Sequence, residues 1–310
     1  MPATPTTTPS VDPGGVSATT LATRRGLFAA LVAAPERPRG TVVLIPGWTG
    51  SKEDFLALLP LLCHAGWLAV GYDQRGQYES GADEHDDFTL DGFAADALAV
   101  CATLDDGPVH MVGHSFGGLV AQAAALAQPD RLASVTLLCS GPGAITAPDE
   151  VESLRLMAEA IETTTLDEVY RAKVEHDTIR AAGRAGARSA APSSAATQPF
   201  LRRRFVANHP GSLSAITLLL VTAADRVDEL AALGVPVHVV YGKDDDGWPI
   251  DVQREMARRL AVTPHVVPGT AHSPAAEDPQ ATAALLTRLL TAPPTAAAVP
   301  GQHCPADRPG

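Results

Sequence analysis

Short apolar runs alternate along this chain with longer stretches in which apolar residues recur every three or four positions. Such a run is followed by a helical pattern three times in the first half, in the pairs 41–45 with 52–64, 68–72 with 90–104, and 109–112 with 116–128. The runs are apolar on both faces, as parallel strands covered on both sides by helices must be. The alternation therefore predicts an α/β fold with a mostly parallel, doubly covered sheet.

This alternation is interrupted once, between apolar runs at 133–139 and 235–241. The residues in between include two amphipathic helical patterns, at 151–163 and 166–177, and a low-complexity stretch at 181–198 that is typical of a mobile link. Beyond the second run the alternation resumes. We therefore predict a core in two parts, residues 21–143 and 229–291, separated by a mainly helical cap insertion at residues 144–228.

Both ends of the chain are poor in large apolar residues. Residues 1–20 are rich in Pro, Thr and Gly, and residues 292–310 repeat this bias, so we expect both segments to be flexible. Next to the first segment, Arg24-Arg25 precedes an apolar stretch that ends in small residues, which resembles a twin-arginine export signal. The same stretch also fits a strand that leads through a turn into the run at 41–45. We predict a cytoplasmic protein, with export through the twin-arginine-like segment as the alternative.

The charge and cysteine content argue against several classes of protein. The 310 residues carry 35 acidic and 23 basic side chains, and the formal net charge of -12 opposes non-specific binding to nucleic acids or anionic lipids. No apolar run approaches the roughly 20 residues that a membrane helix requires. The cysteines are far apart without a C-x-x-C pair, so we expect Cys63, Cys101 and Cys139 to be buried reduced thiols rather than zinc ligands or disulfides. We predict no nucleic-acid or membrane partner, and the pattern indicates no oligomeric state.

The strongest chemical signal is the G-x-S-x-G sequence Gly113-His114-Ser115-Phe116-Gly117, which falls between a predicted strand and a predicted helix. A serine on so sharp a turn is held in a strained backbone conformation, and Gly113 and Gly117 remove Cβ atoms that would collide there. The hydroxyl would then stand exposed at a helix N-terminus, where free N–H groups and the helix dipole favour developing negative charge. Ser115 is therefore the candidate nucleophile.

A serine hydroxyl is a weak nucleophile at neutral pH and needs a histidine base that a carboxylate orients. Candidates for both follow late predicted strands, first the acidic run Asp244-Asp245-Asp246 and then His272. Loops at the carboxyl ends of parallel strands meet at one edge of the sheet, so these residues can approach Ser115. We predict Ser115, Asp245 and His272 as the catalytic residues, with Asp244 and Asp246 as alternatives for the acid.

The order Ser115, Asp245, His272 and the turn around the serine give the chain a resemblance to the α/β-hydrolase superfamily, from about residue 21 to residue 290. In this family the acid commonly lies three residues after a glycine and four before a proline, which selects Asp245 between Gly242 and Pro249. The resemblance implies an α/β-hydrolase fold and serine-hydrolase chemistry. Because haloalkane dehalogenases and epoxide hydrolases of the superfamily use an aspartate at this turn, Ser115 argues against both.

The resemblance also implies an oxyanion hole made of two backbone N–H groups. One belongs to Phe116, directly after the nucleophile, and the other to Trp48, in a loop where Pro46 stands in place of the family's usual histidine. Because the donors are backbone groups, we expect the hole to survive that replacement. The side chains of Trp48, Phe116 and Trp248 border the expected site and are candidates for lining an apolar pocket.

Four further features have structural explanations that we favour over functional ones. The segment Asp73-Gln74-Arg75-Gly76, with Ser80, resembles a structural D-x-R-G-x-x-x-S turn of the family. His114 is expected to pack beneath the serine turn, with substrate contact as the alternative. The basic run Arg202-Arg203-Arg204 fits a solvated face, with binding of an anionic substrate as the alternative. The acidic run 244–246 fits a solvated turn, and since no companion ligands are evident we predict no metal site.

We predict a serine hydrolase that needs no cofactor, acting on a small molecule. The favoured reaction is hydrolysis of a small or medium apolar carboxylic ester through an acyl-enzyme. Other chemistry of the superfamily is the first alternative, as a C–C bond hydrolase, thioesterase, cofactor-free peroxidase or lyase. A non-catalytic ligand-binding protein on the same scaffold is the alternative from a different class. The insertion is expected to decide the substrate, because it controls what reaches the nucleophile.

Overall fold

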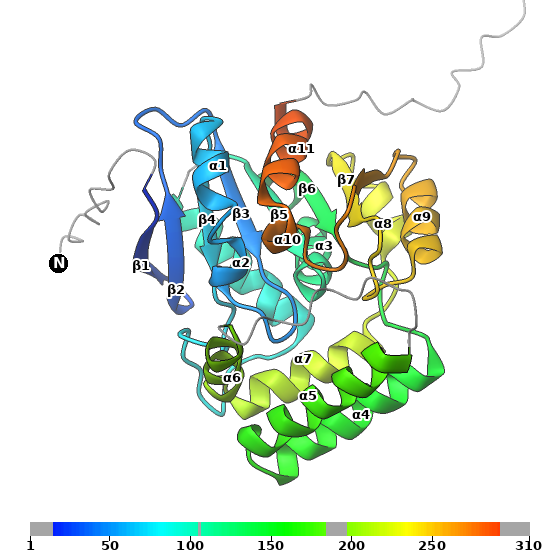
Figure 1. Cartoon of the computed structure of the whole chain (residues 1–310). Helices are drawn as coiled ribbons and strands as arrows, with labels where there is room; N and C mark the ends of the chain where they lie inside the picture. The colour runs from blue at the N-terminus through cyan, green and yellow to red at the C-terminus, as the bar shows by residue number, and fades with distance from the viewer. Residues whose placement is uncertain (1–14, 105–106, 184–196, 292–310) are drawn as a thin grey trace, which may run out of the picture.

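The computed structural model of this chain describes residues 15–104, 107–183 and 197–291, and its centre is an eight-stranded sheet (Figure 1). The strands lie side by side in the order β1-β2-β4-β3-β5-β6-β7-β8. The strands are β1 (Ser17–Thr23), β2 (Gly26–Ala33), β3 (Thr41–Ile45), β4 (Leu68–Tyr72), β5 (Val109–His114), β6 (Leu132–Leu138), β7 (Val237–Gly242) and β8 (His265–Val267). All neighbouring pairs from β4 to β8 are parallel, whereas β1–β2 and β2–β4 are antiparallel. The predicted mostly parallel sheet is confirmed.

Helices cover both faces of this sheet, as its apolar strands require. α1 and α11 pack together on one face, and α2 and α3 pack together on the other, where α8 and α9 extend the layer (Figure 1). The core helices are α1 (Leu59–His64), α2 (Leu90–Leu104), α3 (Phe116–Ala127), α8 (Val227–Ala231), α9 (Ile250–Arg259), α10 (Pro274–Glu277) and α11 (Pro279–Thr291), with the 3-10 turns η1 (Lys52–Phe55) and η2 (Pro129–Arg131). The sheet is therefore doubly covered, as predicted.

The N-terminal hairpin corrects one prediction. Of the expected flexible segment 1–20, residues 1–14 lie outside the described residues, but residues 17–20 form the first part of β1. Threonines favour an extended chain, and every residue of β1 has a partner in β2 across the turn at Arg24-Arg25. The expected flexible tail, residues 292–310, lies outside the described residues.

The helical pattern at 52–64 forms two pieces, η1 and α1, instead of one helix. Pro60 would lie inside an uninterrupted helix, where it lacks an N–H donor and its ring collides with the carbonyl four residues earlier. α1 therefore begins at Leu59 and holds Pro60 in its first turn. Ser51 is the N-cap of η1, and its N–H donates to the Asp54 carboxylate at 3.2 Å.

Among the described residues, the chain between β6 and β7 contains four helices that form a separate layer (Figure 1). They are α4 (Pro148–Thr163), α5 (Leu166–Gly183), α6 (Gln198–Val206) and α7 (Pro210–Thr222). This cap layer has an apolar cluster of its own, made of Ile161, Leu166, Val169, Phe205 and Leu213. α8 returns to the core, because it packs on α3 and α9. Most of the predicted mobile link, residues 184–196, lies outside the described residues.

Two expectations from composition can be compared with the described residues. No single helix among them is long and apolar enough to span a membrane; α6 and α7 reach that length and composition only as a pair, and a bend of 100° separates them. Cys63, Cys101 and Cys139 are buried thiols that form no disulfide, as the sequence predicts.

Candidate active site

Ser115 lies on the sharp turn between β5 and α3 that the sequence predicts. Its backbone has φ 54° and ψ -121°, a strained conformation that a non-glycine residue rarely adopts. A Cβ atom on Gly113 would lie 2.2 Å from the Gly117 carbonyl oxygen, and one on Gly117 would lie 2.4 Å from that of Ile45. The turn can therefore form only because both flanking positions are glycine.

The structure brings the three predicted catalytic residues into one chain of hydrogen bonds. Nε2 of His272 lies 3.0 Å from Oγ of Ser115, and Nδ1 of His272 lies 2.7 Å from Oδ1 of Asp245. In a neutral imidazole one nitrogen donates and the other accepts, so Nδ1 donates to the carboxylate and Nε2 accepts from the serine hydroxyl. Of the three consecutive aspartates, it is Asp245 that holds the histidine, and the alternatives Asp244 and Asp246 do not.

We call this chain of hydrogen bonds the relay. Within it, the negative charge of Asp245 and a positive charge on His272 stabilise each other. Burial would lower the pKa of His272, but its hydrogen bond to Asp245 and the charge of that carboxylate raise the pKa above its usual 6.5. Burial would raise the pKa of Asp245, but hydrogen bonds from His272, Gly247 and Gln253 hold it below its usual 3.8. Asp245 is therefore ionised at neutral pH and stabilises a proton on His272.

Gln253 is part of the site although the sequence contains no motif for it. It lies on α9 and is fully buried, and its Nε2 donates to Oδ2 of Asp245 at 2.7 Å and to the carbonyl oxygen of Trp248 at 3.1 Å. The Gly247 N–H donates to Oδ1 of Asp245 at 2.9 Å. Both carboxylate oxygens are thus held by fixed donors, which sets the orientation of the acid before any substrate binds.

His114 holds the backbone of His272 in place. Its Nε2 donates to the backbone carbonyl oxygen of His272 at 2.6 Å. Burial lowers the pKa of His114 to about 4, so its ring is neutral at physiological pH. His114 therefore fixes the backbone that carries His272, and it also lines the pocket at Ser115, so substrate contact stays an alternative to the predicted packing role.

The predicted oxyanion-hole donors lie on the two segments that flank Ser115. Phe116 opens α3, where the first N–H groups of a helix have no acceptor within the helix. The loop that carries Trp48 passes so close that a Cβ atom on Gly47 would lie 2.9 Å from Cβ of Ser115. Backbone N–H groups of Phe116 and Trp48 can therefore face one carbonyl oxygen bound at Ser115.

Two buried glutamines hold that loop in place. Gln74 Nε2 donates to the Pro46 carbonyl oxygen at 3.0 Å, and Gln77 Nε2 donates to that of Gly47 at 2.9 Å. Both glutamines are 1% exposed. They belong to the D-x-R-G turn and the residues just after it, so this structural turn also orients the loop of the candidate oxyanion hole.

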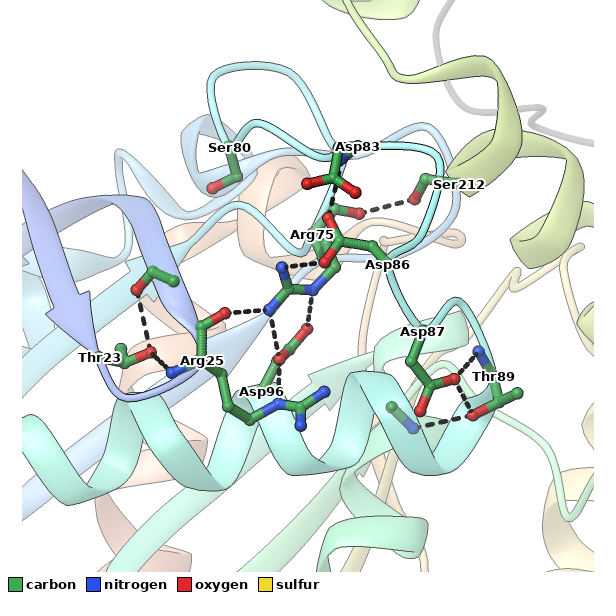
Figure 2. Close-up of polar contacts among 12 residues, drawn as sticks. Thr23, Arg25, Arg75, Ser80, Asp83, Asp86, Asp87, Thr89, Asp96 and Ser212 are labelled. Atoms are coloured by element: carbon green, nitrogen blue, oxygen red, sulfur yellow. Dashed lines mark hydrogen bonds and ion pairs between the residues drawn. The ribbon is translucent and has the colours of Figure 1, made fainter.

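Figure 2 shows how the same turn is fastened to its surroundings. The Arg75 guanidinium donates through Nε and Nη2 to the two oxygens of Asp96 on α2, both at 2.7 Å. It also donates to Asp86 and to the backbone oxygen of Arg25 in the N-terminal hairpin. Ser212 of α7 donates to the Arg75 carbonyl oxygen at 2.6 Å, so the turn joins the core to the cap layer.

A pocket of about 300 Å³ opens above Ser115 and His272. Trp48 and Trp248 line it, as expected, but Phe116 does not, which corrects a prediction. Phe116 is fully buried in the core and packs edge-on against Phe93, with ring centroids 5.7 Å apart, because a side chain at the first position of α3 turns away from the pocket toward α2.

The cap layer supplies three charged residues to this pocket, of which the sequence indicates only Arg204, through the alternative given for the basic run. Glu150 of α4, Lys173 of α5 and Arg204 of α6 all line it. Arg204 donates to the Asp54 carboxylate, which also lines the pocket, so its charge is already partnered. Of the basic run 202–204, Arg204 therefore reaches the site without presenting an unpaired positive charge.

One set of side chains at the site has the composition of a metal site. Cys139, Asp245 and His272 each offer a ligand atom, and these atoms lie within 4.8 Å of one another. Burial raises the pKa of the Cys139 thiol well above its usual 9.0, which disfavours the thiolate that a metal needs. Both ring nitrogens of His272 are engaged in the relay. The residues therefore fit a hydrogen-bond relay better than a metal centre.

Comparisons with known proteins identify the family to which this fold belongs. A family model described as alpha/beta hydrolase fold matches residues 40–279. A probable esterase of Oryza sativa subsp. japonica is 26% identical over 261 residues, which cover 82% of this chain and 93% of that protein. A non-heme haloperoxidase of Rhodococcus erythropolis is 28% identical over 235 residues, which cover 73% of this chain and 83% of that protein. The solved structure of a thermophilic esterase from Thermogutta terrifontis has a TM-score of 0.70 at 22% identity, covering 88% of this chain and 98% of that one.

Proposed function

The chain belongs to the alpha/beta hydrolase fold family, and on that premise we propose that it is a serine hydrolase that cleaves carboxylic esters without a cofactor. The esterase and hydrolase relatives support hydrolysis as the class of reaction. The observation that carries the finer proposal is the relay from Ser115 through His272 to Asp245, with distances of 3.0 Å and 2.7 Å, at the floor of a pocket.

The proposed reaction uses each of these groups in turn. Ser115 Oγ attacks the ester carbonyl carbon while His272 Nε2 takes its proton, and Asp245 stabilises the imidazolium. The carbonyl oxygen becomes negative and accepts hydrogen bonds from the backbone N–H groups of Trp48 and Phe116. The imidazolium then gives its proton to the leaving alcohol. Water, deprotonated by His272, attacks the acyl-enzyme, which releases the acid and restores Ser115.

The first test is turnover of a series of p-nitrophenyl esters by the wild-type chain and by three variants. Ser115→Ala and His272→Ala should each lower kcat by about a thousandfold or more, and Asp245→Asn should also lower it, because the relay acts as a unit. Near-wild-type turnover by Ser115→Ala would overturn the proposal. Absence of turnover on every ester would favour a lyase or a binding protein.

A second candidate is a cofactor-free peroxidase, favoured by the similarity to a non-heme haloperoxidase. In that reaction hydrogen peroxide would replace water as the attacker of the same acyl-enzyme, giving a peracid in place of the acid. The two are separated by measuring peracid in the presence of acetate and hydrogen peroxide. Ester hydrolysis without peracid formation favours the esterase.

A further inference from the structure

The carboxylate of Glu277, on α10, accepts hydrogen bonds from the backbone on either side of His272. The Ala271 N–H donates to its Oε2 at 2.6 Å, and the Ser273 N–H donates to its Oε1 at 2.8 Å. Hydrogen bonds to an ionised acceptor are roughly twice as strong as those between neutral groups. One side chain therefore holds the residues immediately before and after the proposed base.

The capping of α10 accounts for only one of these two bonds. Ser273 is the N-cap of α10, a helix of four residues, and a glutamate in the first turn of a helix commonly accepts from the N-cap N–H. The bond to Ala271 reaches beyond the start of the helix, to the far side of His272. A helix cap does not need that second bond, whereas a device that holds His272 does.

Other contacts hold the same segment through its carbonyl groups. His114 Nε2 donates to the carbonyl oxygen of His272 at 2.6 Å. The segment also passes so close to the end of β7 that a Cβ atom on Gly242 would lie 2.0 Å from the Ala271 carbonyl oxygen. Glu277 completes this arrangement by fixing the N–H groups. The backbone around His272 is thus held through both its donors and its acceptors before any substrate binds.

The charge of Glu277 also acts on the His272 ring. Burial lowers the pKa of His272, the hydrogen bond and charge of Asp245 raise it, and the charge of Glu277 adds to that rise. Because Glu277 is exposed, water and salt screen its charge, and its contribution is smaller than that of the buried Asp245. Both carboxylates nevertheless favour the protonated ring.

We propose that Glu277 is a positioning residue of the reaction, which holds the backbone of His272 so that its ring meets Ser115 and Asp245, and whose charge helps the ring to keep the transferred proton. This inference rests on the proposed function and deepens it. The proton moves from Ser115 Oγ to His272 Nε2 and on to the leaving alcohol. Glu277 takes no proton and acts only through His272.

Two variants separate the geometry of Glu277 from its charge. In Glu277→Gln the amide oxygen can accept from one N–H, but the amide nitrogen cannot accept from the other. For p-nitrophenyl acetate, kcat should fall by about tenfold or more with KM within about twofold, because the base is less well oriented. The acid limb of kcat/KM should move to lower pH, since a negative charge near the imidazolium is lost. Glu277→Asp keeps the charge on a shorter side chain, so kcat should fall while the limb stays close to that of the wild type.

Asp278→Asn is the matched control. Asp278 is the next residue, and its carboxylate accepts from the Ala281 N–H at 2.9 Å, at the start of α11. Both Glu277→Gln and Asp278→Asn should lower Tm, because each weakens a helix cap. Only Glu277→Gln should change kcat and the pH profile. A lower Tm with wild-type kcat and profile in Glu277→Gln would overturn the proposal and leave Glu277 as a helix cap.

A measurement without turnover separates this proposal from the proposed function. The His272 ring is titrated by NMR in Ser115→Ala and in the double variant that also carries Glu277→Gln. A lower midpoint in the double variant supports the proposal even if no ester is hydrolysed, and identical midpoints overturn it. Hydrolysis that depends on Ser115 but is unaffected by Glu277→Gln overturns the role of Glu277 and leaves the esterase standing.

Discussion

His272 determines the pH dependence that the proposed reaction must show. The base acts only when it is neutral, and Asp245 raises its pKa above 6.5. Because the proton binds more tightly than to a free imidazole, kcat/KM should fall as the pH drops through a value above 6.5. A profile of kcat/KM for a p-nitrophenyl ester between pH 5 and pH 9 measures this midpoint. A midpoint clearly below 6.5 would contradict the assignment of His272 as the base.

Gln253 should act as a positioning residue through its bond to Asp245. In Gln253→Leu the carboxylate loses a fixed donor, and kcat should fall by about tenfold to a hundredfold with little change in KM, because the relay is less well oriented. Gln253→Glu keeps the shape but places a second negative charge beside Asp245, which should raise the pKa of His272 and move the acid limb of the profile to higher pH. An unchanged profile in Gln253→Glu would show that Gln253 serves folding only.

The residues that could be predicted from the sequence are those whose chemistry forces a local pattern. Ser115 is found because its turn needs a glycine two residues before it and two after it. Gln253 has no such signal, since a glutamine eight residues beyond the acid looks like any helix position. The prediction that Phe116 lines the pocket was wrong for a similar reason. The position of a residue next to the nucleophile in the sequence does not determine the direction of its side chain at the first position of a helix.

Strands and helices were predictable where one residue pattern dominates. β3 and β4 coincide with apolar runs that have no competing interpretation. β1 was missed because its threonines and small residues also suit a flexible segment, and only its pairing with β2 decides between the two. The break between η1 and α1 was readable in principle from Pro60, which outweighs the helical periodicity around it.

Because β5, α3 and β3 approach closely around the serine turn, a larger side chain there should lower the stability of the fold. Gly113→Ala should destabilise the fold strongly, by about 3 kcal/mol or more, because the new methyl group overlaps the backbone of Gly117 and cannot be accommodated by a rotamer change. Gly81→Ala is the matched control, since nothing lies within 4 Å of a Cβ atom there. Thermal unfolding of both variants checks this, and equal Tm values would contradict the geometry.

At the level of the whole molecule, Arg75 connects parts of the chain that are far apart in sequence. Its guanidinium reaches Asp96 and the N-terminal hairpin, and its carbonyl accepts from Ser212 of the cap layer (Figure 2). Further contacts join cap and core, among them those from Trp48 Nε1 to Thr217 and from Arg204 to Asp54. No sequence pattern indicates these contacts, which is why the cap residues that line the pocket could not be predicted.

Asp96→Ala should test how much this junction contributes to stability. The change removes the carboxylate that binds the Arg75 guanidinium, 8% exposed, through two hydrogen bonds and leaves the ion pair with Asp86 in place; removing one partner of a buried ion pair costs about 3–5 kcal/mol. Asp91→Ala on the same helix is the control, because Asp91 is 86% exposed and should change the free energy of unfolding by less than about 1 kcal/mol. Urea unfolding measures both. A similar small effect in the two variants would contradict the role of the junction.

The insertion between β6 and β7 has a consequence for the chain while it is being made. Domains form from the N-terminus onward during synthesis. A growing chain that has passed α3 already holds Ser115, but Asp245 and His272 follow only after the whole cap layer has been translated. An unfinished or prematurely terminated chain therefore carries the proposed nucleophile without its base. Such fragments should not hydrolyse esters in the cell, and only chains that have been synthesised beyond His272 should be active.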